Sequence, residues 1–102
     1  MSDPKKNQIN IELTDEMAEG IYSNLAIITH SHSEFIIDFV KILPGIPKAK
    51  VKSRIILTPQ HAKRLFRALQ DNISKYERMH GEIIAPETEG LPLNLGGPTA
   101  QA

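Results

Sequence analysis

Three side chains that could bind a metal ion, His30, His32 and Glu34, recur at every second residue of the sequence. On one face of a strand, this spacing would place two imidazoles and a carboxylate side by side, which suits zinc or nickel. The stretch around them is short and polar, however, and is typical of a hairpin connection, in which a tight turn breaks the alternation. We therefore interpret the histidines as polar turn residues and expect no metal or other cofactor. A small metal-dependent enzyme at these residues is the third hypothesis.

A second candidate for chemistry is the carboxylate of Asp38, which lies within the apolar segment Phe35–Ile42. Glu34 is roughly 13 Å away along an extended strand, which is too far for a paired general acid and base. A buried aspartate can instead accept hydrogen bonds from backbone amides or from a cation such as Arg54 on a neighbouring strand. The chain also has no cysteine, no nucleophile elbow and no glycine-rich phosphate loop. We expect a structural role for Asp38 and no enzymatic activity.

A cationic segment could bind the phosphates of a nucleic acid, because its basic residues alternate along one expected strand. No acidic residue lies between Lys41 and Arg54, and the expected helix adds further basic residues. Against this function, the segment has no aromatic side chain on which bases could stack, and lysines also discourage edge-to-edge pairing of sheets. We keep a nucleic-acid-binding module as the alternative function, with Lys48, Lys50, Lys52, Arg54, Lys63 and Arg67 as its contact residues.

Composition indicates one small domain without a strong charge preference. The chain has 102 residues, and 12 lysines and arginines balance 12 aspartates and glutamates. Nothing therefore draws the whole molecule toward nucleic acid or an anionic membrane. No apolar run approaches the roughly 20 residues of a membrane span, and Met1–Asn10 lacks the apolar segment of a signal peptide. With the absence of cysteine, these features predict a cytoplasmic protein that does not contact membranes.

Hydrophobic periodicity predicts a single α+β domain over residues 8–81, a four-stranded antiparallel meander sheet followed by one long C-terminal helix. In Gln8–Leu13, apolar and polar residues alternate, which predicts a half-buried first strand. Thr58 and Gly81 are a typical N-cap and a typical C-terminal stop for the helix between them. The other expected elements are strands at Ile21–Thr29, Phe35–Ile42 and Lys48–Thr58 and a helix at Pro59–His80.

The two ends of the chain are expected to be flexible. Met1–Asn7 is polar and contains Pro4. Glu82–Ala102 is rich in proline and glycine, a composition typical of disordered tails. Leu91–Leu95 contains three leucines that could add a strand to a sheet edge, and this alternative stays open.

A resemblance to a known family rests on three stretches of the sequence, GIYSNLAIITHSHSEFIIDF, LPGIPKAKVKSRIILTP and HAKRLFRALQDNISKYE. They resemble a family of small bacterial and archaeal proteins classed as domain of unknown function three-four-six-seven. The resemblance covers about Ile9 to Gly81 and implies a single independent domain in an intracellular setting, but it supplies no catalytic residues. The order of strands followed by a long helix is also similar to the SecB export chaperone, a topological analogy that does not fix function.

The expected strands have apolar residues on both sides, whereas only one amphipathic helix is available to cover them. The helix stripe that includes Leu65, Phe66 and Leu69 is expected to cover one sheet face. Each large apolar side chain left in water forfeits about 1.5–3 kcal/mol of a total stability of about 5–15 kcal/mol. We therefore predict a homodimer or higher homo-oligomer that binds a protein partner or an unfolded segment. The expected contact residues are Phe35, Ile37 and Phe39 on one face and Ile36, Val40 and Ile42 on the other.

Overall fold

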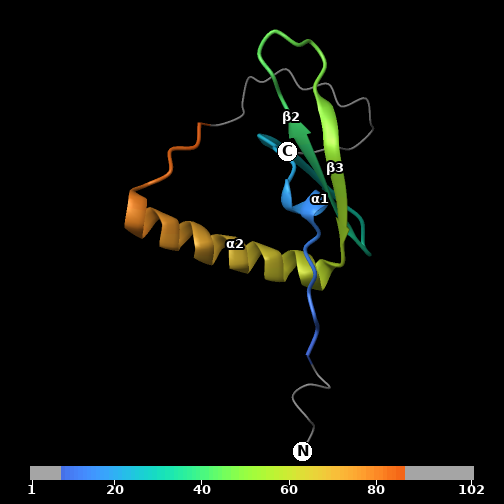
Figure 1. The fold of residues 1–102 in the computed structure, drawn as a ribbon, viewed down its shortest axis with the longest axis vertical. Helices are drawn as coiled ribbons and strands as arrows, with labels where there is room; N and C mark the ends of the chain where they lie inside the picture. The colour runs from blue at the N-terminus through green and yellow to red at the C-terminus, as the bar shows by residue number, and fades with distance from the viewer. Residues whose placement is uncertain (1–7, 87–102) are drawn as a thin grey trace, which may run out of the picture.

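The computed structural model describes residues 8–86 of the chain, in which it places two helices and three strands. The segment Met1–Asn7, predicted to be flexible, and the leucines of Leu91–Leu95 lie outside the described residues. In chain order, the elements are α1 at Asp15–Ala18, β1 at Leu25–His30, β2 at Phe35–Lys41, β3 at Lys50–Leu57 and α2 at Pro59–His80 (Figure 1).

The strands form one antiparallel sheet in the order β1-β2-β3, so the predicted meander followed by a C-terminal helix is confirmed. The pairing places Ile28 opposite Ile37 and Ile37 opposite Ile55. Directly opposed residues share a face, and successive residues alternate between faces. We call the face with these three isoleucines the helix-side face. The other face, which carries Asp38 opposite Arg54, is called the Asp38 face.

The predicted first strand, Gln8–Leu13, is wrong, because the sheet of the described residues has three strands and not four. The segment instead runs as an arm away from the sheet (Figure 1). Its apolar residues Ile9, Ile11 and Leu13 are 86%, 92% and 70% exposed. Alternation reports which side of a strand would be apolar, but pairing needs an edge within reach. The intervening α1 and Gly20, which has a φ of 77°, direct the arm away from such an edge.

Polar side chains explain why β1 begins at Leu25 and not at Ile21 as predicted. The Asn24 side-chain amide donates to the Ile42 carbonyl at 2.9 Å and accepts from the Ile42 amide at 2.8 Å. These two bonds replace the backbone pair that would continue the ladder. The Ser23 hydroxyl also donates to the carbonyls of Leu25 and Val40, each at 3.0 Å. The side chains thus close this end of the β1–β2 ladder.

An irregularity in the β2–β3 pairing changes the faces that the β3 side chains reach. Phe39 lies opposite Ser53, but Val40 lies opposite Val51, so Lys52 is an extra residue on β3. Such a bulge interrupts the simple alternation of side chains. Simple alternation along the expected strand Lys48–Thr58 predicts that Val51, Ile55 and Leu57 share one face. This prediction is wrong for Val51, which lies on the Asp38 face because it is opposite Val40.

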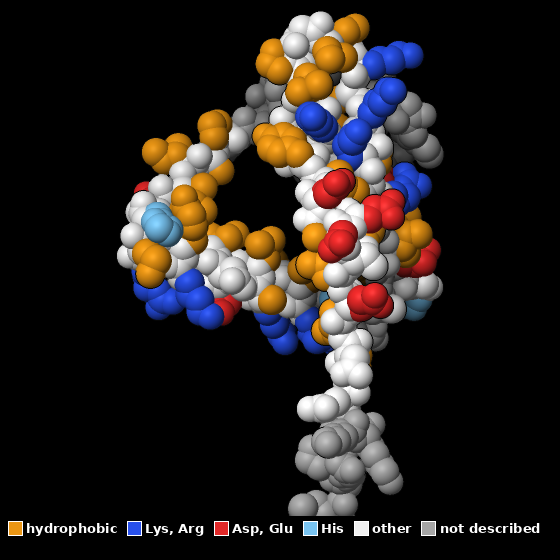
Figure 2. Space-filling view, in the orientation of Figure 1, with side chains coloured by type: hydrophobic (Ala, Val, Ile, Leu, Met, Phe, Trp, Pro, Cys, Tyr) orange, Lys and Arg blue, Asp and Glu red, His pale blue; other side chains and the backbone are white. Residues whose placement is uncertain are grey.

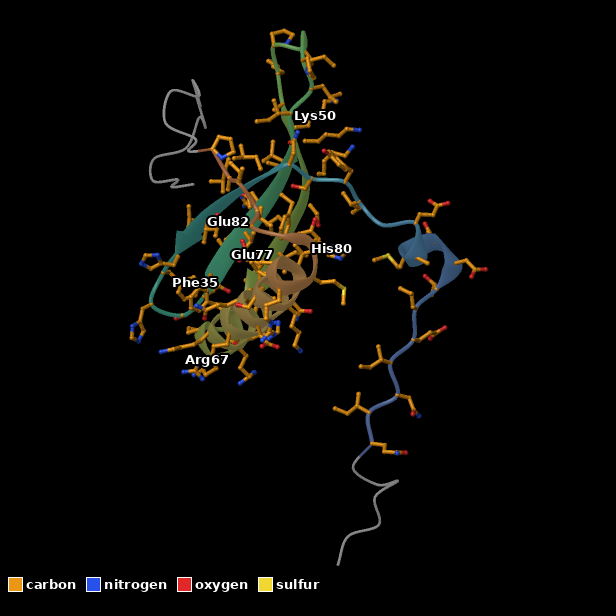
Figure 3. The ribbon with its side chains drawn as sticks, turned by 90° about the vertical axis from the view of Figure 1, so that its left-hand side faces the viewer. Phe35, Lys50, Arg67, Glu77, His80 and Glu82 are labelled. Carbon is orange, nitrogen blue, oxygen red and sulfur yellow. The ribbon has the colours of Figure 1, made fainter. Side chains whose placement is uncertain are left out.

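The predicted bounds of the long helix are confirmed, because α2 spans Pro59–His80. The Thr58 hydroxyl accepts from the His61 amide at 3.2 Å and satisfies one of the free N–H groups of the first turn. Gly81 ends the helix with a φ of 93°, which a residue with a side chain rarely adopts. The Glu77 carboxylate then accepts from the Ile83 amide at 2.9 Å. Figure 3 shows Glu77, His80 and Glu82 together at this end of the helix.

The core of the described residues is small. Its buried apolar side chains are Ile27, Val40 and Leu57, which are 5%, 4% and 8% exposed. The helix α2 starts beside the sheet, where β3 ends, and then leads away from it (Figure 1). Most of its apolar stripe is therefore not buried against the strands. Little apolar area is thus buried within residues 8–86, although burial of such area is the main source of folding free energy.

Candidate binding groove

An apolar groove lies between the helix-side face of the sheet and the N-terminal half of α2. Its volume is about 580 Å³, and its walls are almost entirely apolar. Figure 2 shows hydrophobic side chains along the opening between the sheet and the helix. On the sheet, the lining residues are Ile28, Phe35, Ile37 and Leu57. From α2 come Pro59, Ala62, Lys63, Leu65, Phe66 and Leu69.

The sheet wall of the groove follows from the strand register. The β2 residues Phe35 and Ile37 lie two apart and therefore point to one side. They lie opposite Leu57 and Ile55 of β3, which continue the apolar row across the sheet. The ring of Phe35 also stacks on His30, with 5.4 Å between the ring centroids. The wall is thus a continuous apolar surface that spans all three strands.

The helix wall of the groove consists of residues three or four apart, which lie on one side of an α-helix. Leu65, Phe66 and Leu69 are 40%, 63% and 55% exposed. The stripe continues through Ile73 and Tyr76, which are also exposed and lie beyond the groove. The expectation that this stripe is core is therefore wrong for a single copy, because its side chains remain largely open to water.

The six predicted partner-contact residues are divided between three places. Phe35 and Ile37 line the groove, and Phe39 belongs to the same face two residues further along β2. Ile36 and Val40 lie on the Asp38 face, where Val40 is buried. Ile42 follows the end of β2 and is bound through its backbone by Asn24. Of this set, the structure thus places only Phe35 and Ile37 in the groove, where they face the apolar stripe of α2.

Asp38 and Arg54 form a two-point ion pair across β2 and β3. The Arg54 Nε donates to Oδ1 at 2.6 Å, and Nη2 donates to Oδ2 at 2.9 Å. The hydrogen bond from Arg54 lowers the pKa of the Asp38 carboxyl below its usual value, against a smaller rise from burial. The same pairing raises the pKa of the Arg54 guanidinium. This is the predicted structural partnership of the buried aspartate.

The predicted nucleic-acid contacts do not form one surface in a single copy. Lys50 lies directly opposite Lys41 in the β2–β3 register, at the end of this ribbon that is away from α2, which we call the distal end. Arg54, in contrast, forms an ion pair with Asp38. Figure 3 shows Lys50 near the top of the view and Arg67 well below it, on α2. Figure 2 likewise separates the basic residues of the strands from those along the outer side of α2. Of the predicted set, Lys48, Lys50 and Lys52 are neighbours in sequence near the distal ribbon, and Lys63 and Arg67 belong to α2.

The histidine candidates lie around the β1–β2 turn. His30 is the last residue of β1 and stacks on Phe35, while His32 and Glu34 are exposed in the connection. Between residues 8 and 86, no group of three His, Asp or Glu side chains could hold a metal ion. In that same part of the chain, no helix combines the length and apolar character that crossing a bilayer requires.

Comparison with known families relates the chain to a family whose function is unknown. A family model described as Protein of unknown function (DUF3467) matches residues 1–85. The chain belongs to this family. Neither the comparison with curated proteins nor the comparison with solved structures finds a match. For this DUF3467 protein, the topological likeness to SecB therefore stays a prediction.

The contribution of α2 to the groove was missed, although a signal for it was present in the sequence. A helix of 22 residues is roughly 33 Å long. A strand of seven residues such as β2 spans only roughly 23 Å. The helix is therefore too long for its stripe to be covered by strands of this length. That mismatch could have placed Leu65, Phe66 and Leu69 among the candidate binding residues of this DUF3467 protein.

Proposed function

We propose that this protein is a non-enzymatic, homo-oligomeric binding module that holds a protein partner or an unfolded segment in the apolar groove. The observation that carries the proposal is the exposure of two apolar walls that face the same space. One wall is the helix-side face of the sheet, and the other is the stripe of α2. Leaving both walls in water is unfavourable, and a second polypeptide that covers them gains the free energy of burial.

The chemistry of the groove supports a polypeptide ligand. Its volume of about 580 Å³ is within the range of concave sites that bury most of the surface of a ligand. Among the described residues that line the groove, Lys63 alone is charged, so recognition depends on shape and apolar contact. A groove between a sheet face and a helix suits an extended or helical segment with apolar residues along one side.

Binding of an unfolded polypeptide tests this function. The probe is a protein that is reduced and alkylated so that it cannot refold. Phe66→Ser removes a large side chain from the helix wall, and Arg67→Ser is the matched control outside the groove lining. We expect Phe66→Ser to weaken binding roughly tenfold, as the loss of a buried aromatic contact does, and Arg67→Ser to bind like the wild type. Equal binding by both variants, or no binding by the wild type, contradicts the proposal.

A second candidate function is nucleic-acid binding at the distal end of the β2–β3 ribbon, in the cytoplasm. Its supporting observation is the direct pairing of Lys41 with Lys50, because opposed like charges are unfavourable unless an anion lies between them. A titration of RNA and DNA binding against salt separates this candidate from the first. Phosphate contacts give an affinity that falls steeply with salt, and Lys50→Ala should lower the slope, whereas Phe66→Ser should leave it unchanged.

A further inference from the structure

We propose that the N-terminal arm Gln8–Leu13 is a fourth strand in trans, which pairs with the outer edge of β1 in a second copy of the chain. The inference rests on the homo-oligomer of the proposed function and names the contact that forms it. Three observations carry it: the composition of the arm, the direction in which it leaves the molecule, and the chemistry of the edge that receives it.

The arm has the side-chain pattern of a strand but no partner among the described residues. Ile9, Ile11 and Leu13 alternate with polar residues, and all three are strongly exposed. A strand with one apolar side is stable only when that side is covered and its backbone groups are paired. The arm therefore has both an apolar side and a backbone that are available to a sheet edge.

The arm lies away from its own sheet. In the views of both Figure 1 and Figure 3, the arm leads away from the strands. The short helix α1, capped by the Thr14 hydroxyl, and Gly20 with its positive φ lie between the arm and β1. A segment that leaves in this direction reaches the edge of another copy, and the exchange is reciprocal in a two-fold dimer.

The two edges of the sheet differ in how they discourage pairing. The edge strand β3 carries Lys50, Lys52 and Arg54 and contains the bulge at Lys52, and both features oppose the addition of another strand. The edge strand β1, in contrast, has the sequence LAIITH, without lysine, arginine, proline or a bulge. It is six residues long, which is also the length of Gln8–Leu13. The outer edge of β1, which no other described strand pairs with, and the arm thus match in length and in apolar character.

The paired arm extends the binding groove. Ile28 of β1 lies on the helix-side face, lines the groove and remains half exposed. An added strand beside β1 with Ile9, Ile11 and Leu13 on that face continues the apolar wall past Ile28. The second copy therefore contributes side chains to the groove, and assembly and binding are coupled.

Cross-linking between differently labelled copies tests the arrangement, because the chain has no cysteine of its own. Chains with Ile11→Cys are mixed with chains with Ile28→Cys and treated with a short bismaleimide. We expect a covalent dimer from this mixture and none from a control mixture of Ile11→Cys with Ser74→Cys on α2. The absence of a dimer in the first mixture contradicts the proposal. A chain that carries both Ile11→Cys and Ile28→Cys gives a further check. Cross-linking only within single chains of this double variant also contradicts the proposal.

A second measurement separates the arm from the groove. Ile11→Pro removes a backbone N–H that strand pairing needs, in an arm that contributes nothing to the core of its own copy. We expect Ile11→Pro to raise the dissociation constant of the dimer at least tenfold in sedimentation equilibrium and Ile11→Val to leave it unchanged. A dissociation constant for Ile11→Pro equal to that of the wild type overturns this inference. If Phe66→Ser nevertheless weakens the binding of unfolded polypeptide, the proposed function stands. If Ile11→Pro weakens the dimer but Phe66→Ser binds unfolded polypeptide like the wild type, the pairing of the arm is supported and binding in the groove is overturned.

Discussion

Asp38 and Arg54 face each other across β2 and β3, and two hydrogen bonds of 2.6 and 2.9 Å join the guanidinium to the carboxylate. Asp38 is only 8% exposed, whereas the Arg54 side chain is 60% exposed. The pair therefore neutralises a buried carboxylate while its cation stays hydrated. The pair joins β2 to β3 next to the bulge, which is a structural role.

The pH dependence of stability should report this pair. The hydrogen bond from Arg54 lowers the pKa of Asp38 in the folded state, so the ionised carboxylate favours folding. Its contribution is complete above the unfolded pKa and is lost as the pH falls through the folded pKa. We expect Asp38→Asn to lower the free energy of unfolding by about 1–2 kcal/mol at neutral pH. The difference should shrink in acid, as measured by urea denaturation at several pH values.

The matched control for this prediction is Asp71→Asn. Asp71 pairs with Lys75 at 3.0 Å on the surface of α2, where both side chains are more than 60% exposed. Exposed pairs of this kind contribute little to stability. An equal loss of stability in the two variants would show that Asp38 has no special role in the folded state.

Asn24 should be important for stability although it is exposed. Its side chain makes two hydrogen bonds to the backbone of Ile42 and closes the end of the β1–β2 ladder. We expect Asn24→Ala to lower the free energy of unfolding by about 1–2 kcal/mol, because two bonds are lost together. Asn72→Ala, which removes a single side-chain bond to the Ala68 carbonyl, should be nearly neutral because alanine has the higher helix propensity. Chemical denaturation distinguishes the two, and similar values for both variants would contradict the account.

The sequence was sufficient to predict elements whose signals are local. The helix α2 has its own cap at Thr58 and its own stop at Gly81, and neither depends on distant residues. The turn at Pro44-Gly45 also depends on local preferences, with a Gly45 φ of 77° and a bond from the Ile46 amide to the Leu43 carbonyl. Both features follow from backbone preferences of the residues concerned.

The features that could not be predicted from the sequence depend on tertiary contacts. The alternation of Gln8–Leu13 is that of a strand, but whether the segment pairs depends on which edge it can reach. The bond between Asn24 and Ile42 joins residues 18 positions apart, and no local pattern indicates it. The bulge at Lys52 moved Val51 to the other face, since one extra residue reverses the alternation.

The opposed lysines at the distal ribbon predict a gain in stability on charge reversal. Lys41 and Lys50 are cross-strand partners, and replacing one of them with an acid turns repulsion into attraction. Lys50→Glu should raise the free energy of unfolding by about 0.2–1 kcal/mol at low salt, with the gain reduced at high salt. Lys63→Glu on α2 is the control and should show no such gain. A loss of stability in Lys50→Glu would contradict the expected repulsion.

The capping hydroxyl of Thr58 should stabilise the first turn of α2. It accepts from the His61 amide at 3.2 Å, where β3 leads into the helix. Thr58→Ala should lower the free energy of unfolding by about 1 kcal/mol, and Thr58→Ser, which keeps the oxygen, should have a smaller effect. Thermal denaturation followed by circular dichroism measures both, and equal melting temperatures for wild type and Thr58→Ala would contradict this assignment.

Sedimentation equilibrium of the full chain tests whether a second polypeptide covers the apolar surfaces that one copy leaves open. Over the micromolar range, we predict a reversible shift from one copy to two or more, together with binding of a hydrophobic dye to the groove that the assembled copies leave open. A protein that stays a single copy at every concentration and binds no dye would contradict the claim.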